Sequence, residues 1–177
     1  MKIVCINGAP TSGKDLFCKY CAEEIDGFME VFSSVDLVKK IATDLGWDGV
    51  KSLRNRKFLS DLKDLLTEWD DVPYKNTIAN IEDWKYQLEQ VDIDTEDAVA
   101  FVHVREPKEI DKFAKRNNAI TLLLRRPEVE GKETSNHADS NILNYNYDFE
   151  LWNDGSRWKL RTEARLFLKV IGVKVKE

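Results

Sequence analysis

The sequence predicts an α/β domain in which a parallel sheet of about five strands is covered by helices on both faces. Short apolar runs alternate with longer segments of helical periodicity, and the first apolar run leads through a glycine-rich turn into a helix. The chain has 177 residues, of which 42% are hydrophobic, and this is enough for one domain with a single core. We therefore expect residues 1–177 to form a single domain, without internal repeats or linkers.

Five segments have the composition of strands. The clearest is AVAFVHV, a continuous apolar run of the kind that is covered on both faces of a parallel sheet. The predicted strands are residues 2–7, 28–34, 98–104, 119–124 and 147–152.

Helices are predicted between these strands, where apolar residues recur every three or four positions. Pro107 suits the first turn of a helix, and Asn153, Asp154 and Gly155 turn the chain into the last one. The predicted helices are residues 14–26, 36–45, about 50–69, 74–91, 107–116 and 157–171, and residues 125–141 are predicted to be a polar loop. This alternation implies right-handed crossovers between parallel strands.

The net charge of the chain argues against some classes of binding partner. A formal net charge of -5 argues against wrapping a nucleic-acid polymer or binding an anionic membrane, because both need a cationic face. The apolar stretch at the N-terminus covers about five residues, which is too short for a signal sequence or a membrane span. We therefore expect a cytoplasmic protein that binds small charged molecules. A homodimer is compatible with the sequence, which does not determine the oligomeric state.

The three cysteines are expected to be buried free thiols. The pair Cys18 and Cys21 has the spacing of a redox or metal motif, but the sequence has no second pair. The two histidines, His103 and His137, are distant in sequence. A role in the core is therefore favoured over metal or redox chemistry.

The segment GAPTSGKD at residues 8–15 nearly matches a phosphate-binding loop, whose pattern is G-x-x-x-x-G-K followed by Ser or Thr. Glycines let successive backbone N–H groups point at phosphate oxygens, and the N-terminus of the following helix adds a favourable dipole. Lys14 would neutralise the β and γ phosphates. The alternative is a plain strand-to-helix turn that contains glycines. The residues expected to bind ATP are Gly8, Ala9, Pro10, Thr11, Ser12, Gly13, Lys14, Asp15 and Leu16.

Asp15 stands where such loops have the hydroxyl that binds Mg²⁺. One hypothesis is that Asp15 is the metal ligand, directly or through water. The other is that it only stabilises the first turn of the helix. Both remain open. The sequence G-K-D favours a small-molecule kinase over a GTPase or a motor ATPase.

Four motifs in order resemble the deoxynucleoside monophosphate kinases of tailed bacteriophages and their relatives among nucleotide and phosphomevalonate kinases. The first is G-x-x-x-x-G-K-D itself, and the second is HVREPKEI at 103–110, which is similar to the family's D-V-R-x-x-N-E. The third is the step from Arg126 to Pro127 after a strand, and the fourth is YDFELWNDGS at 147–156, similar to D-Y-x-I-x-N-D-G-T. The resemblance spans nearly the whole chain.

The resemblance implies a three-layer P-loop kinase fold with strand order 2-3-1-4-5. It implies ATP and Mg²⁺ as cofactors and transfer of a phosphoryl group to a nucleoside monophosphate, with deoxynucleotides favoured. It places the acceptor in a helical region at about 35–90 and a lid at about 125–141. The implied catalytic residues are Lys14, Arg105 and Arg126; further ATP contacts are Arg125, Asn153 and Gly155; the acceptor contacts are Asp36, Lys39, Arg54, Arg105 and Glu109.

Each of these assignments has a plain alternative. Arg105 has one in a surface ion pair with Glu109, one helical turn further on. Asp36, Lys39 and Arg54 are explained equally well as solvated helix charges, and Asn153 to Gly155 as a bare turn.

Two positions depart from the family pattern. His103 replaces the family's Asp before V-R, and the segment HADS around His137 replaces a serine followed by glutamate. Loss of the acid would leave Asp15 or Glu106 to compensate, or would impair catalysis. For His103 itself we favour a hydrogen-bonded histidine at a strand end.

Two other functions remain open. The acceptor could be another small phosphate compound, of the phosphomevalonate or dephospho-coenzyme A type. The protein could also bind nucleotides without catalysing transfer, acting through a partner.

Overall fold

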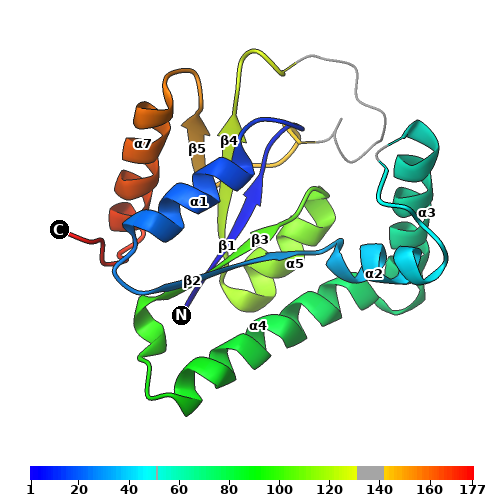
Figure 1. Ribbon diagram of the computed structural model, residues 1–177, viewed down its shortest axis with the longest axis horizontal. Helices are drawn as coiled ribbons and strands as arrows, with labels where there is room; N and C mark the ends of the chain where they lie inside the picture. The colour runs from blue at the N-terminus through cyan, green and yellow to red at the C-terminus, as the bar shows by residue number, and fades with distance from the viewer. Residues whose placement is uncertain (51, 131–141) are drawn as a thin grey trace.

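The computed structural model describes residues 1–50, 52–130 and 142–177 and shows a five-stranded sheet in the order β2-β3-β1-β4-β5 (Figure 1). All four neighbouring pairs of strands are parallel. The strands are β1 (Lys2–Asn7), β2 (Phe28–Ser33), β3 (Ala98–His103), β4 (Ile120–Arg125) and β5 (Phe149–Trp152). The predicted α/β class and strand order are confirmed.

The helices of the described residues agree with the predicted ones to within a few residues at each end. They are α1 (Lys14–Glu24), α2 (Asp36–Asp44), α3 (Leu53–Asp70), α4 (Val72–Gln90), α5 (Pro107–Asn117) and α7 (Arg157–Val170), with a short 3₁₀ turn η1 (Thr95–Asp97). None of these helices is both long and apolar enough to cross a membrane.

Local interactions explain the shifted ends. Helix α3 begins at Leu53 because the Ser52 side chain accepts a hydrogen bond from Asn55 N, at 3.1 Å, and so caps the helix. Strand β5 begins at Phe149 because the Asp148 carboxylate instead binds the backbone N–H and the hydroxyl of Thr121, both at 2.8 Å.

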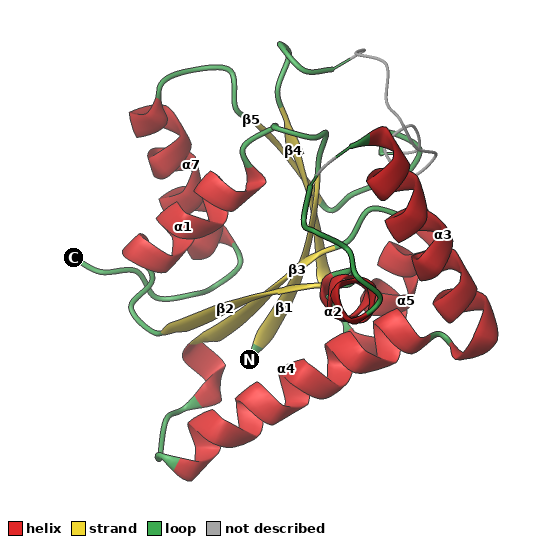
Figure 2. Cartoon of the chain, turned by 45° about the vertical axis from the view of Figure 1, so that its right-hand side comes forward, coloured by secondary structure: helices red, strands yellow, loops and turns green. Residues whose placement is uncertain are grey.

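The helices form a layer on each face of the sheet. Figure 2 shows α1 and α7 on one face and α4 and α5 on the other. Under α1 and α7, the ring of Phe17 meets those of Phe101 and Phe167 edge-on, with centroids 6.5 and 5.8 Å apart. On the opposite face, Tyr74 of α4 packs on Phe113 of α5 with centroids 4.8 Å apart. The sheet is thus held between two apolar cores.

The cysteines belong to these cores. Cys5, Cys18 and Cys21 are free and buried, as expected. Burial raises the pKa of Cys18 to about 12, so its thiol stays protonated at neutral pH and packs as a small apolar group.

Strand β1 lies at the centre of the sheet. Its pairing sets Ile6 beside His103 of β3 and Asn7 beside Leu123 of β4, so three strands end at the same edge. The order of strands reverses here, because β3 and then β2 lie on one side of β1, and β4 and then β5 on the other. Ligands of open α/β sheets bind at such an edge.

The layer of α1 and α7 is fastened by a buried carboxylate. Glu24, at the end of α1, accepts a hydrogen bond from Arg165 at 2.7 Å and another from Arg161. The Arg165 and Arg161 guanidinium groups on α7 hold the pKa of Glu24 below its ordinary value. The charged carboxylate therefore stabilises the native state.

We predict that Glu24→Gln lowers the free energy of unfolding by about 1–3 kcal/mol at neutral pH. Because the folded-state pKa is depressed, this stabilisation is present above the unfolded value and is lost as pH falls through the folded one. Urea unfolding at neutral pH and near pH 3 measures the difference, which should shrink in acid. Glu23→Gln, in the same turn, is the control; an equal loss there would contradict the account.

Candidate functional site

The turn between β1 and α1 packs so closely that it requires two glycines. Gly8 has φ of 151°, and a Cβ there would lie 2.3 Å from the carbonyl oxygen of Leu124 on β4. Gly13 has φ of 99°, and its Cβ would lie 2.5 Å from Nδ2 of Asn153. Any side chain at either position would clash and strain the backbone. The glycines are therefore fixed by the packing of the loop against the ends of the neighbouring strands.

Two asparagines, Asn7 and Asn153, make hydrogen bonds to the backbone of this loop. Asn7 Oδ1 accepts a hydrogen bond from Gly8 N at 2.8 Å, while its Nδ2 donates to Arg105 O and to the Tyr147 hydroxyl. Asn153 Nδ2 donates to Ser12 O at 2.9 Å. Asn7 was missed by the sequence analysis, although a polar residue that ends a buried strand was a usable signal. The expected role of Asn153 beside adenine stays a prediction, and the structure adds its contact with the loop.

The interior of the loop carries a buried hydroxyl and an ammonium group. Ser12 is fully buried, and its Oγ has no hydrogen-bond partner among the described residues. This Oγ would lie 2.7 Å from a Cβ at Gly8, so it is enclosed by the loop itself. Lys14 Nζ donates to the carbonyl oxygens of Gly8 and Ala9. A buried donor without a partner costs free energy unless a ligand or water satisfies it.

Asp15 lies in the first turn of α1, and its side chain is 97% exposed. His103, at the end of β3, has Nδ1 3.7 Å from Asp15 Oδ1 and Nε2 3.7 Å from Cys18 Sγ. Burial lowers the pKa of His103, so the imidazole is neutral at pH 7. These residues line one end of a shallow groove of about 350 Å³ between α1 and β2. The structure thus places Asp15, which replaces the hydroxyl of the general phosphate-loop pattern, next to His103, which replaces the acid of the family pattern.

Asp15 fits a magnesium ion only as one ligand among several. The described part of the chain holds no group of three or more His, Cys, Asp or Glu side chains arranged for a metal. Magnesium in nucleotide enzymes keeps several waters and takes one or two carboxylates together with substrate phosphates. An exposed carboxylate directly after Lys14 suits that arrangement.

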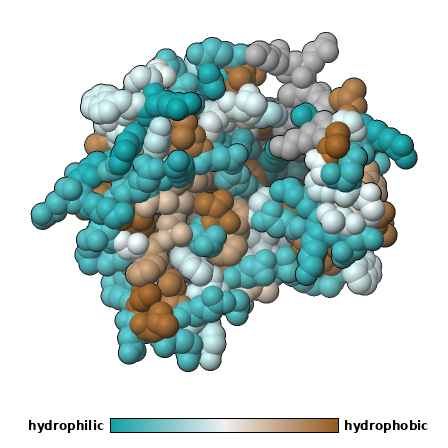
Figure 3. Space-filling model, viewed as in Figure 1, coloured by the Kyte–Doolittle hydropathy of each residue, from teal (hydrophilic) through white to brown (hydrophobic). Residues whose placement is uncertain are grey.

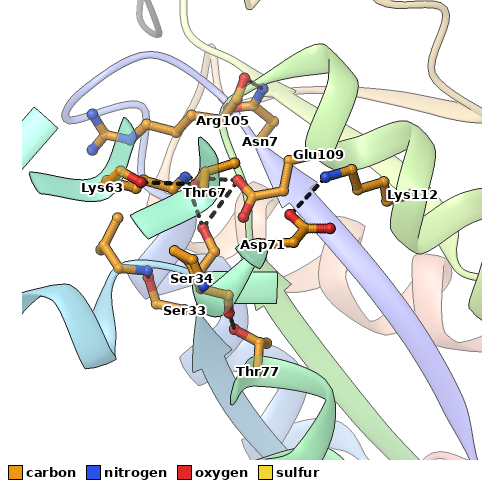
Figure 4. Close-up of polar contacts among 12 residues, drawn as sticks. Asn7, Ser33, Ser34, Lys63, Thr67, Asp71, Thr77, Arg105, Glu109 and Lys112 are labelled. Atoms are coloured by element: carbon orange, nitrogen blue, oxygen red, sulfur yellow. Dashed lines mark hydrogen bonds and ion pairs between the residues drawn. The ribbon is translucent and has the colours of Figure 1, made fainter. Parts of the chain in front are cut away.

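A second polar cluster lies on the side of α3 (Figure 4). Glu109 Oε2 on α5 accepts hydrogen bonds from Lys63 Nζ on α3 at 2.7 Å and from the Ser34 hydroxyl at 3.2 Å. Lys63 Nζ also donates to the Ser34 hydroxyl at 3.1 Å. The side chains of Lys63 and Glu109 are 14% and 12% exposed. A largely buried ion pair therefore joins two helices and the end of β2.

Lys63 was not named by the sequence analysis, although it falls within the predicted acceptor region. A lysine on the inner side of a helix that also carries Leu59 and Leu66 was the available signal. In Figure 4, the Arg105 side chain extends above this cluster, toward the same side as Lys63. The structure thus joins Glu109 to a cation that was not predicted, Lys63.

The other predicted acceptor residues lie at the ends of α2 and α3. Asp36 accepts a hydrogen bond from Ser33 N at 3.0 Å and pairs with Lys39 at 3.4 Å, so it also organises the turn into α2. Arg54 is exposed in the first turn of α3. Their contact with an acceptor stays a prediction.

Arg125, the last residue of β4, and Arg126, which follows it, differ in their contacts. Arg125 makes two hydrogen bonds to Glu130, at 2.8 and 2.7 Å, and its guanidinium stacks on Trp152 at 4.3 Å. Arg126 is more exposed, and its Nη1 donates to Thr11 O of the loop at 3.4 Å. Arg126 is therefore better placed than Arg125 to reach a ligand on the loop. Residues 131–141 of the predicted lid, with His137, lie outside the described residues.

The last predicted ATP contact, Gly155, lies in the turn before α7, and a Cβ there would lie 2.8 Å from Lys159 Cδ. Its role toward a ligand stays a prediction. The same turn supplies Asn153, which contacts the loop. The turn after β5 and the glycine loop are therefore neighbours.

No protein-family model and no curated protein sequence matches this chain. Among solved structures, it is similar to the tunicamycin resistance protein of Deinococcus radiodurans, with 12% identity over 99% of this chain and 98% of that one and a TM-score of 0.56. It also matches an APS kinase of Mycobacterium tuberculosis, with 15% identity over 95% and 96% and a TM-score of 0.44. A shikimate kinase of Bacteroides thetaiotaomicron is 10% identical over 97% of this chain and 99% of that one, with a TM-score of 0.47.

At 12% identity, the similarity to the tunicamycin resistance protein shows a shared fold and nothing finer. The chain has an α/β fold whose sheet order, β2-β3-β1-β4-β5, is the one predicted from the resemblance. The resemblance to the bacteriophage enzymes rests on the sequence motifs alone and stays a hypothesis.

Proposed function

We propose that this protein is an ATP-dependent phosphotransferase that transfers the γ-phosphoryl group of ATP to a nucleoside monophosphate. The observation that carries the proposal is the loop from Gly8 to Lys14, at the carboxyl end of the central strand. It combines two obligatory glycines, a buried hydroxyl without a described partner and a lysine at a helix N-terminus. Together these features suit a bound phosphate chain.

The donor site follows from the loop. The backbone N–H groups and the field of α1 would hold the phosphates, and the Ser12 hydroxyl would gain the partner that it lacks among the described residues. Lys14 Nζ would exchange its bonds to two carbonyl oxygens for bonds to phosphate oxygens. Arg126 lies close enough to the loop to add a second positive charge. Asp15 would help to hold Mg²⁺, which supplies charge neutralisation between the phosphates.

The acceptor site would lie across the same edge of the sheet. Arg105 follows the end of β3, and Lys63 on α3 directs its ammonium group to Glu109 and Ser34. Glu109 and Ser34 fix the ammonium group of Lys63 by hydrogen bonds. Two cations near one another suit the dianionic phosphate of a nucleoside monophosphate.

Phosphoryl transfer asks little covalent chemistry of a protein; it asks for positioning and for positive charge around the transferred group. Lys14, Arg126 and Arg105 would supply that charge, and the loop and α3 would supply the positions. At position 103 this chain has a histidine where the bacteriophage family has an aspartate. Nucleotide binding without transfer is therefore the second candidate, and Asp15 beside His103 is the observation behind it.

The test of the donor site is ADP release from ATP and Mg²⁺ with a panel of ribo- and deoxynucleoside monophosphates, phosphomevalonate and dephospho-coenzyme A. We expect turnover that depends on a nucleoside monophosphate and a loss in kcat/KM of about 10²–10³-fold or more in Lys14→Ala. Lys19→Ala, an exposed lysine on the same helix, is the matched control. Unchanged turnover in Lys14→Ala would refute the proposal, and ATP binding without turnover would favour the second candidate.

The test of the acceptor site is the variant Lys63→Met. We expect the KM for the nucleoside monophosphate to rise about tenfold, because a charge-assisted hydrogen bond to its phosphate is lost, while the KM for ATP stays the same. Lys112→Met is the matched control, since Lys112 forms a comparable ion pair with Asp71 at 2.6 Å on the same helix as Glu109. Equal effects on both substrates, or in both variants, would assign Lys63 a structural role only.

A further inference from the structure

Helix α3 carries an apolar stripe on its outer face. Phe58, Leu62, Leu65 and Trp69 follow one another at spacings of four, three and four, so they lie along one side of the helix. None of the residues of α3 is buried, and Phe58, Leu65 and Trp69 are 37%, 63% and 76% exposed. Helix α3 lies at the right-hand margin of Figure 1, and brown side chains appear along the same margin in Figure 3.

Charged residues flank this stripe in an unusual order. Arg54 and Lys57 lie toward the N-terminus of α3, while Asp61, Asp64 and Glu68 follow on the same flank toward its C-terminus. All five are exposed. The first turn has no acidic residue and the last turn has no basic one, which is the reverse of what the helix dipole favours. Lys57 and Asp61 form an ion pair at 2.8 Å within the helix, but the overall order of the charges does not favour the helix dipole.

We propose that two copies of this chain pair through α3, with the two helices antiparallel about a two-fold axis. Positions 58 and 69 are equally far from the midpoint of the stripe, and so are 62 and 65. In an antiparallel pair, Phe58 therefore faces Trp69 of the second copy, and Leu62 faces its Leu65. The stripe is self-complementary, as a two-fold interface must be.

The charged residues beside the stripe also favour an antiparallel pair of α3 helices. Flanks on the same side of the stripe meet in an antiparallel pair, so the basic end of one α3 lies beside the acidic end of the other. Lys57 then comes next to Glu68 of the second copy. Each dipole end also lies beside the opposite end of the neighbouring helix. A parallel two-fold pair would instead place the two charged flanks on opposite sides of the interface, so the bases of one copy would not meet the acids of the other.

The size of the stripe predicts a weak dimer. Its three exposed side chains offer roughly 300–400 Å² of apolar surface per copy. With the charged flanks, two copies would approach the lower end of specific interfaces, near 1,200 Å² in total. We therefore expect a Kd of about micromolar order. Lys63 lies on the other side of α3, where it contacts Glu109, so pairing leaves the candidate acceptor site uncovered.

Sedimentation velocity over a range of protein concentrations tests this proposal. We expect a reversible monomer–dimer equilibrium that Leu65→Lys shifts to monomer, with Kd at least about tenfold higher. Leu166→Lys on α7 is the matched control, because Leu166 is 50% exposed, and it should leave the equilibrium unchanged. A chain that stays monomeric at every concentration, or a dimer that tolerates Leu65→Lys, would overturn the proposal.

A charge exchange tests the orientation. Lys57→Glu alone and Glu68→Lys alone should each weaken the dimer, since each places like charges opposite one another. The double variant should recover the parent equilibrium, because every contact between the two copies is again between opposite charges. Urea unfolding of all three variants separates lost pairing from lost folding. Additive weakening in the double variant would contradict the antiparallel arrangement.

Discussion

The contact between the first loop glycine and the carbonyl end of β4 is the constraint on which the rest of the structure depends. A Cβ on Gly8 would lie 2.3 Å from Leu124 O, so the chain leaves β1 pressed against its neighbour. This closeness reflects the place of β1 beside β4, and β3 lies on the other side of β1. It also brings Asn153, after β5, against Gly13 and Ser12. The loop is therefore held by strands on both sides before any ligand binds, and such preorganisation lowers the cost of binding phosphate.

The proposed donor and acceptor sites lie at the same edge of the sheet but are built from different elements, the glycine loop and helix α3. The donor loop is held by close packing at Gly8 and Gly13 and by hydrogen bonds to Asn7 and Asn153. The acceptor side depends on α3, which has no buried residue and is joined to α5 by the pair of Lys63 and Glu109. The stripe of Phe58, Leu65 and Trp69 is the surface that a second copy would cover.

Most of the fold could be predicted from the sequence, because apolar periodicity, turn residues and the glycine loop all pointed to the same alternation of strands and helices. The exact ends of the helices and strands could not be predicted, because they are set by hydrogen bonds such as those of Ser52 and Asp148 and not by apolar periodicity. The loop residues of the site were named, but Asn7 and Lys63 were not. Their importance comes from partners up to 140 residues away in sequence, which a local pattern does not reveal.

The most direct test of the central claim, that the loop from Gly8 to Lys14 holds phosphates, is a calorimetric titration of ATP with Mg²⁺ into the parent protein and Lys14→Ala. The account predicts one ATP per chain and an affinity at least about tenfold lower in the variant, at unchanged thermal stability. Equal affinity in both proteins, or no binding to the parent, would contradict it.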